Sequence, residues 1–463
     1  MKKILTVLIV LIINFNSVSA KTQEASVQKV DLSFEQAYEL MLENNNSLKA
    51  YNELINKQKY EKRAALGEFS PKVVMNATYL HFSENWTLNS SGNVMNIPFS
   101  ATTLIQDRNL FTMGGTAVWN VFTGGKLLSN HAAARAKLEA ADHKYREIKD
   151  NLTVELVKRY YGLRLARDVV EVRKQVSDGM DKHLRDAKLL EREGMISKSE
   201  RLHAEVAASD AKRDYKAALR DANIAQEGLK ALIKSENANL KDIYVEPKSM
   251  LFIYKKSDVD LDQMKENAIA NNPQLMQLRA KKKALNAKYH AQMANYSPTV
   301  SLVAYDIFAT DNLSQAVPHA AFGVTANWLL FDGLSRYNNV RAADSERKMA
   351  DYEIADAQFN IESLVIKQYE DLMKYKEKYD SSDKNVENAK EALRTADLAF
   401  REGLGTSLQV TDAQMMLSKV NIDRLKAIYD YDVTLVDLLK TNGDAKEILH
   451  FIVSSSTETL EDK

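Results

Sequence analysis

The two halves of this 463-residue chain repeat one pattern, and this constrains the fold more than any single motif. Segment 33–71 resembles segment 260–298 at one constant offset, and both end in Ser-Pro. Segment 119–194 likewise resembles 328–403, since each has a Trp, a Phe and a Gly near its start and Arg-Glu-Gly at its end. Internal repeats of this length predict two equivalent structural units in tandem.

Composition favours helices and excludes several kinds of chemistry. Only 15 glycines and 6 prolines occur, and both residues break helices, so long uninterrupted helices are expected. Lys+Arg and Asp+Glu both number 63, so no bulk charge indicates a nucleic-acid partner. Cysteine is absent, which excludes disulfides, thiol catalysis and thiolate metal sites.

The start of the chain has the pattern of an export signal. In residues 1–20, two lysines precede an apolar run, and small residues end at Ala20, as in a cleavable signal peptide. A membrane anchor needs roughly 20 apolar residues, and this run is shorter. The expected organisation is therefore a signal peptide, repeat 1 at 21–241, repeat 2 at 242–441, and a partly disordered tail at 442–463.

Each repeat is predicted to run helix, strand, strand, long helix, return helix. Ser33 and Asp260 each precede a Gln by three residues, a capping box that starts the first helix. Pro71 and Pro298 end that helix, because proline disfavours helix at the preceding residue. The apolar period then changes from 3.6 to 2, which predicts strands at about 72–82 and 104–122 in repeat 1 and at about 299–308 and 319–331 in repeat 2.

The remainder of each repeat is predicted to be a hairpin of long helices. The predicted ranges are 126–192 and 335–401 for the long helices, and 199–234 and 407–440 for the return helices. A helix of about 67 residues spans roughly 100 Å. Repeat 1 also has additional residues at 88–101, rich in Asn, Ser and Gly, which are predicted to form a long loop.

The predicted strands have one apolar face and aromatic residues toward their ends, a pattern that suits the wall of a β-barrel in lipid. The alternative is a soluble β-hairpin that buries this face on the helices. Four strands cannot close a membrane barrel, which needs at least eight. Two copies supply eight strands and three supply twelve, and twelve leave a pore. A trimer is therefore predicted, with a 12-stranded β-barrel continuous with a long α-helical barrel.

These features together resemble the TolC-like outer membrane factor family (outer membrane efflux proteins). The resemblance covers about 32–441 and rests on features that occur in the same order in both halves: Asn44-Asn45 and Asn271-Asn272-Pro273, the two Ser-Pro boundaries, the Trp119 and Trp328 motifs, and the turns at Gly194 and Gly403. It implies a homotrimer whose barrel sits in lipid of the bacterial outer membrane and whose helices cross the periplasm. It also implies a passive duct of a tripartite efflux pump or type I secretion system, served by a periplasmic adaptor and an inner-membrane transporter.

The family's constriction is ringed by two acidic residues three apart, just after the second turn glycine. Here these positions are Gln409 and Asp412, and a helical i, i+3 pair shares one face. Glu200 matches another acidic position of the family's closed end. Rings of carboxylates select cations, so three copies of Asp412 are expected to favour them. The alternative is an ordinary solvated helix face near a turn.

The resemblance also assigns roles to the hairpin turns. Gly194 and Gly403 mark the reversals, where the adaptor is expected to bind. The family's latch between neighbouring helices uses a tyrosine and an arginine, but Phe400 and Gly405 occupy those positions here. Arg401 lies next to them and is the candidate substitute.

No enzymatic function is predicted. The eight histidines form no pair at metal-ligand spacing, and nucleotide-binding and nucleophile motifs are absent, so no metal or cofactor is expected. The alternative to a duct is a soluble periplasmic coiled-coil adaptor or scaffold. An adaptor is expected to carry one helical hairpin flanked by compact β domains, whereas this chain has two hairpins and no such domains.

Overall fold

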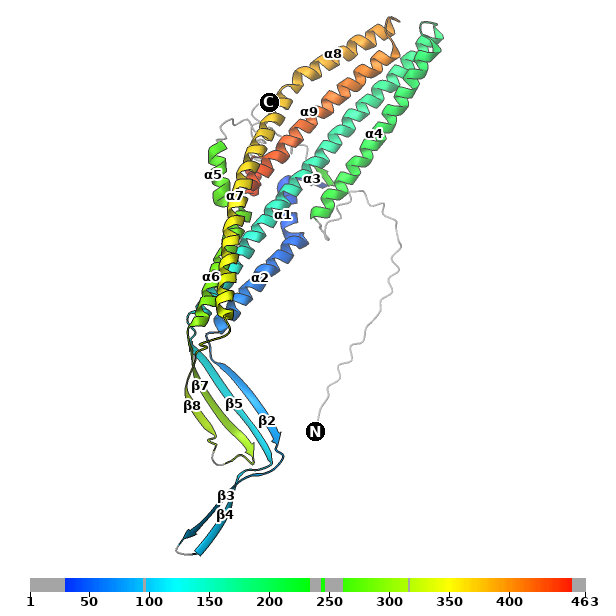
Figure 1. Ribbon diagram of the computed structural model, residues 1–463. Helices are drawn as coiled ribbons and strands as arrows, with labels where there is room; N and C mark the ends of the chain where they lie inside the picture. The colour runs from blue at the N-terminus through cyan, green and yellow to red at the C-terminus, as the bar shows by residue number, and fades with distance from the viewer. Residues whose placement is uncertain (1–29, 95–96, 234–242, 246–260, 315–316, 452–463) are drawn as a thin grey trace, which may run out of the picture.

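The computed structural model describes residues 30–94, 97–233, 243–245, 261–314 and 317–451. The molecule is elongated, with long helices at one end and a twisted sheet at the other (Figure 1). The predicted signal peptide and the last residues of the predicted disordered tail lie outside the described residues.

The two repeats contain matching elements in the same order. In the first they are β1 (Val30–Leu32), α1 (Phe34–Asn44), α2 (Asn46–Gly67), β2 (Lys72–His81), β3 (Trp86–Val94), β4 (Ile97–Gln106), β5 (Asn109–Phe122), α3 (Lys126–Arg192) and α4 (Lys198–Ile233). In the second they are β6 (Ile243–Val245), α5 (Leu261–Asn271), α6 (Pro273–Met293), η1 (Ala294–Tyr296), β7 (Thr299–Asp311), β8 (Ala320–Asn327), α7 (Ser335–Asp380), α8 (Ser382–Arg401), α9 (Ser407–Thr441) and η2 (Ala445–Glu447).

The first helix of each repeat is two helices rather than one. Asn45 ends α1 and starts α2, because its side-chain oxygen accepts a hydrogen bond from the Ser47 backbone N–H at 2.9 Å. Asn272 does the same between α5 and α6, with Pro273 as the first helical residue. An asparagine cap inside an otherwise helical pattern therefore restarts each helix.

The second long helix is also interrupted, so the prediction of one helix over 335–401 is wrong. The break between α7 and α8 is at Ser381, and α3 has no matching break. The hydroxyl groups of Ser381 and Ser382 donate to the Lys378 and Tyr379 carbonyls, at 3.0 and 2.6 Å. Such local bonds compete with the helical ladder and bend it.

The strands depart from the predicted ranges in two places. The predicted loop at 88–101 is wrong, because β3 and β4 pair there in an antiparallel ribbon, and β5 begins only at Asn109. The predicted strand at 319–331 ends early, at Asn327, which pairs with Thr299. Pro298 precedes Thr299 and has no N–H to donate, so the ladder stops there.

Within the described residues, β2, β5, β7 and β8 form one antiparallel sheet in that order. The register brings large apolar side chains from all four strands to one face: Met75, Tyr79, Trp119, Leu302, Phe322 and Val324. Phe322 is 94% exposed, so this face has no cover in the single chain. β2 and β8 are the edge strands, and among the described residues no strand pairs with their outer edges.

The helices form a wall one layer thick. Near the sheet, α3 lies between α2 and α6, and α7 packs on α6; near the far end, α3 lies between α4 and α9, and α8 packs on α9 (Figure 1). Among the described helices, none combines the length and the apolar character that a membrane crossing requires.

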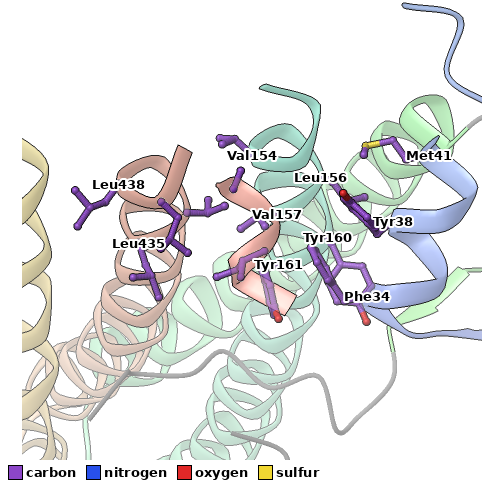
Figure 2. Close-up of a cluster of buried hydrophobic side chains, with 14 of the residues drawn as sticks. Phe34, Tyr38, Met41, Val154, Leu156, Val157, Tyr160, Tyr161, Leu435 and Leu438 are labelled. Atoms are coloured by element: carbon purple, nitrogen blue, oxygen red, sulfur yellow. The ribbon is translucent and has the colours of Figure 1, made fainter. Parts of the chain in front are cut away.

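The largest core lies halfway along the helices, where α1 and α9 cover α3 (Figure 2). Phe34 packs edge-on against Tyr160 at 5.3 Å between ring centroids, and Tyr160 packs edge-on against Tyr161 at the same separation. The Tyr160 hydroxyl donates to the Leu32 carbonyl at 2.9 Å. Each fully buried large side chain contributes about 1.5–3 kcal/mol, so this cluster anchors the middle of the thin wall.

Candidate functional site

The two helical hairpins reverse side by side at the end of the molecule farthest from the sheet (Figure 1). Gly194 ends α3 with φ of 74°, and Gly403 ends α8 with φ of 72°. This left-handed conformation lets the following amides bond back to the helix, as Met195 N–H does to the Leu190 carbonyl at 2.8 Å. Glycine is favoured there because it has no Cβ to clash. The sequence-predicted turn glycines therefore do shape both tips.

Glu200 joins the first hairpin to the second. It lies in the first turn of α4, and its Oε2 accepts a hydrogen bond from the Ser407 backbone N–H at 2.6 Å. Ser407 is the first residue of α9 and is fully buried. The first amides of a helix have no partner within it, and a carboxylate there also interacts favourably with the helix dipole.

His183 makes a second contact between the hairpins. It projects from α3, is only 3% exposed, and its Nε2 is hydrogen-bonded to Ser407 Oγ at 2.8 Å. Its ring lies 4.5 Å from the buried ring of Phe400. Among the described residues, its Nδ1 has no hydrogen-bond partner. Burial lowers the pKa of His183, although the nearby Asp397, Asp186 and Glu200 carboxylates oppose that shift.

Arg401 makes the third contact between the hairpins. Its guanidinium lies 3.2 Å from the Asp186 carboxylate of α3 and 3.1 Å from Asp397 of its own helix. A small apolar cluster lies beneath the three contacts, and it includes Met180, Ala187, Ala204, Phe400 and Val410. Polar bonds above a shared core therefore hold the two tips together.

Gln409 and Asp412 lie apart from this junction. Both line an open groove between α8 and α9, together with Asn388, Glu391 and Thr395. Gln409 Oε1 also accepts from the Thr406 backbone N–H at 2.9 Å and completes the capping box of α9. The structure thus brings Gln409 and Asp412 onto one face, whereas Glu200 is bonded to Ser407.

Three residues of the junction, His183, Asp186 and Ser407, are not among the site residues that the sequence predicts. One signal was available for His183, because Val176, Met180, His183 and Ala187 follow the 3–4 spacing of a buried helical stripe. A histidine on such a stripe needs a buried partner. No pattern indicated that the partner would be Ser407, which is 224 residues away. In the part of the chain that the structure describes, no three His, Asp or Glu residues are grouped so that they hold a metal ion.

A model of the family described as "Outer membrane efflux protein" matches residues 37–233 and 265–444, which is most of the chain. The chain therefore belongs to the outer membrane efflux protein family. Membership places it in the bacterial outer membrane, with its helices extending into the periplasm. No curated protein matches the sequence.

Several solved structures have the same fold at low sequence identity. CusC, whose structures concern folding and transmembrane channel formation, matches with a TM-score of 0.74 and 15% identity, covering 90% of this chain and 93% of CusC. The Campylobacter jejuni outer membrane channel CmeC matches with 0.73 and 15%, covering 91% and 89%. The open state of the Neisseria gonorrhoeae outer membrane channel MtrE matches with 0.69 and 18%, covering 93% and 94%.

Proposed function

We propose that three copies of this chain form a passive export duct through the outer membrane, in a tripartite efflux pump or a type I secretion system. One observation carries the proposal: the sheet has two open edges and a bare apolar face, and it continues directly into long helices. A sheet of this kind is incomplete in a single chain.

The sheet supports closure with other copies. An unpaired backbone group in lipid costs several kcal/mol, so both open edges need partners. The four strands alternate in direction, so β8 of one copy meets β2 of the next in the antiparallel sense. A contact between two different edges repeats around a ring until it closes. With four strands from each chain, three copies reach the twelve strands of a pore.

The edges of the helical wall also support a ring. The edge helix α7 carries Tyr352 at 77% exposure and Phe359 at 69%, and the opposite edge helix α2 carries the exposed Tyr60. Along its length, the edge helix α4 exposes Val206 and Ile224. Large exposed apolar side chains along an edge mark an interface. Neighbouring copies would cover them and convert the wall into a tube.

The tips are the proposed contact for the partners. Met195 and Leu404, which directly follow the two turn glycines, are exposed and apolar. We assign this end to the periplasmic adaptor, which would connect the duct to an energy-supplying inner-membrane transporter. In the trimer, Asp412 and Gln409 would ring the periplasmic constriction, with Glu200 nearby. Arg401, already paired with Asp186, would act as a latch that holds the closed state.

Fractionation and conductance test the proposal together. The protein should be recovered from outer membranes as a trimer on an unheated gel, and the trimer should form ion-conducting channels in planar bilayers. A soluble monomer would instead support the alternative of a periplasmic adaptor or scaffold. Trimers that never conduct would refute the duct while leaving the assembly intact.

A further inference from the structure

The ribbon of β3 and β4 is the most unusual surface of the molecule. It projects past the four-stranded sheet, on the side away from the helices (Figure 1). Residues 86–106 contain no charged side chain, in a chain that is 27% charged. Charged residues flank the ribbon at its base: Glu84 precedes it, and Asp107 and Arg108 follow it.

The ribbon has one apolar face and one polar face. Cross-strand pairing puts Leu88 opposite Thr103, Ser90 opposite Ala101 and Gly92 opposite Phe99. Strand alternation adds Trp86 and Ile97 to that face, and each of these two side chains is 69% exposed. The other face carries mainly hydroxyl and amide groups, from Thr87, Asn89, Ser91, Ser100 and Thr102, with Leu104 as a large apolar residue near its base. This is an amphipathic surface with no cover in the single chain.

The ribbon is held at a defined angle rather than hanging as a free loop. Gln106, its last residue, donates from Nε2 to the Asn312 carbonyl at 2.7 Å, and its Oε1 accepts from the Ser314 N–H at 3.3 Å. Arg108 donates to the Phe82 carbonyl across the base at 3.1 Å. The Gln106 bonds tie the ribbon to the segment between β7 and β8, and the Arg108 bond closes its base.

We propose that the ribbons of neighbouring copies pack against one another through their apolar faces and cover the outer mouth of the channel. The inference rests on the trimer proposed above. A two-stranded hairpin alone is marginally stable in water, so this ribbon needs a partner surface. In a ring of copies, each ribbon leaves its sheet next to β2, the edge strand that would pair with the neighbouring copy. The ribbons of all copies therefore surround the symmetry axis of the ring.

The absence of charge favours another copy of the chain as the partner of the ribbon. Around a symmetry axis each residue faces its own equivalents, so any charged side chain would meet a like charge. The ribbon avoids this over its whole length. A membrane surface is the competing occupant, but segments that lie on membranes typically carry Lys or Arg on their polar face. The polar face of the ribbon has neither.

Adjacent serines offer a matched test in a chain without cysteine. Ser90 lies on the apolar face and Ser91 on the polar face. In intact trimers, Ser90→Cys should form a disulfide that joins two of the three chains on oxidation, and Ser91→Cys should not. If Ser90→Cys trimers form normally but stay uncross-linked, or if both variants cross-link equally, the ribbon proposal is refuted. If no trimer forms even without substitution, the proposed function fails first.

A conductance measurement tests the cover independently. Leu88→Lys with Phe99→Lys places like charges on the apolar face and should raise single-channel conductance by separating the ribbons. Asn89→Lys with Thr102→Lys adds the same charge on the polar face and should leave conductance near the unsubstituted level. Equal conductance in both double variants would overturn the proposal, provided that both are recovered as trimers.

Discussion

The bond from Ser407 N–H to Glu200 provides the sharpest test of how the two hairpins are joined. Glu200→Ala removes an ionised acceptor from the buried start of α9. A hydrogen bond to a charged group contributes about 1.5–3 kcal/mol, and a carboxylate at a helix N-terminus about 0.3–1 kcal/mol. Glu200 is partly exposed, so a net loss of about 2 kcal/mol is expected.

Hydrogen exchange resolved to single amides measures this loss directly. Since 1.4 kcal/mol is a factor of ten, the Ser407 amide should exchange about 30-fold faster in Glu200→Ala than in the unsubstituted protein. Glu200→Gln keeps an uncharged acceptor and should lose about half as much, which corresponds to roughly fivefold faster exchange. The remainder of α9 should be little affected.

Glu205→Ala is the matched control. Glu205 lies on the same helix but pairs with Arg201 of that helix and does not reach the second hairpin. Its replacement should leave the exchange of Ser407 unchanged. If Ser407 in Glu200→Ala exchanges at the unsubstituted rate, or if Glu205→Ala accelerates its exchange to the same extent, the Glu200 carboxylate does not join the hairpins.

Four further predictions follow from individual residues. Burial and the neighbouring Asp444 raise the pKa of Asp150 to about 7, so its folded form holds a proton that the unfolded chain loses above about pH 4. Asp150→Asn should therefore raise the melting temperature at pH 8 but not at pH 4. The lowered pKa of His183 works in the opposite sense, because the stability it contributes is complete above about pH 6.5 and falls with acidification. Once exchange rates are divided by the intrinsic amide rate at each pH, the protection of the tips should therefore be lower at pH 5 than at pH 7, and His183→Gln should flatten that dependence. Gly403→Ala forces a Cβ into a left-handed turn at a cost of roughly 1–2 kcal/mol and should increase proteolysis at the tip, whereas Gly228→Ala, within a helix and with open space around it, should not. Asp412→Asn should weaken cation selectivity in planar bilayers if three copies ring the constriction, and unchanged selectivity would remove Asp412 from it.

The period of the apolar residues and the positions of proline and glycine predicted much of this fold. The change of period after Pro71 and Pro298 located the strands, and the scarcity of glycine and proline indicated long helices such as α3. The interruptions at Asn45 and Ser381 were missed because they depend on side chains that bond to the local backbone, which composition does not reveal. The composition of 88–101 predicts a loop because Asn, Ser and Gly are common in loops, whereas cross-strand pairing decides whether such residues form strands.

Only those parts of the candidate site that join residues close in the sequence were predictable. Gln409 and Asp412 share a groove because helical spacing puts residues three apart on one face. The bonds of Ser407 to Glu200 and His183 join residues more than 200 positions apart. They depend on how two long hairpins align along their lengths, and the sequence contains no local pattern for that alignment.

The central claim is that one chain is an incomplete part of a ring, and a count of chains tests it most directly. Native mass spectrometry of the protein extracted from outer membranes in mild detergent measures that number. The open edges at β2 and β8, with four strands from each copy, predict a mass of three mature chains. A monomer, or an assembly with any other number of chains, would contradict the account.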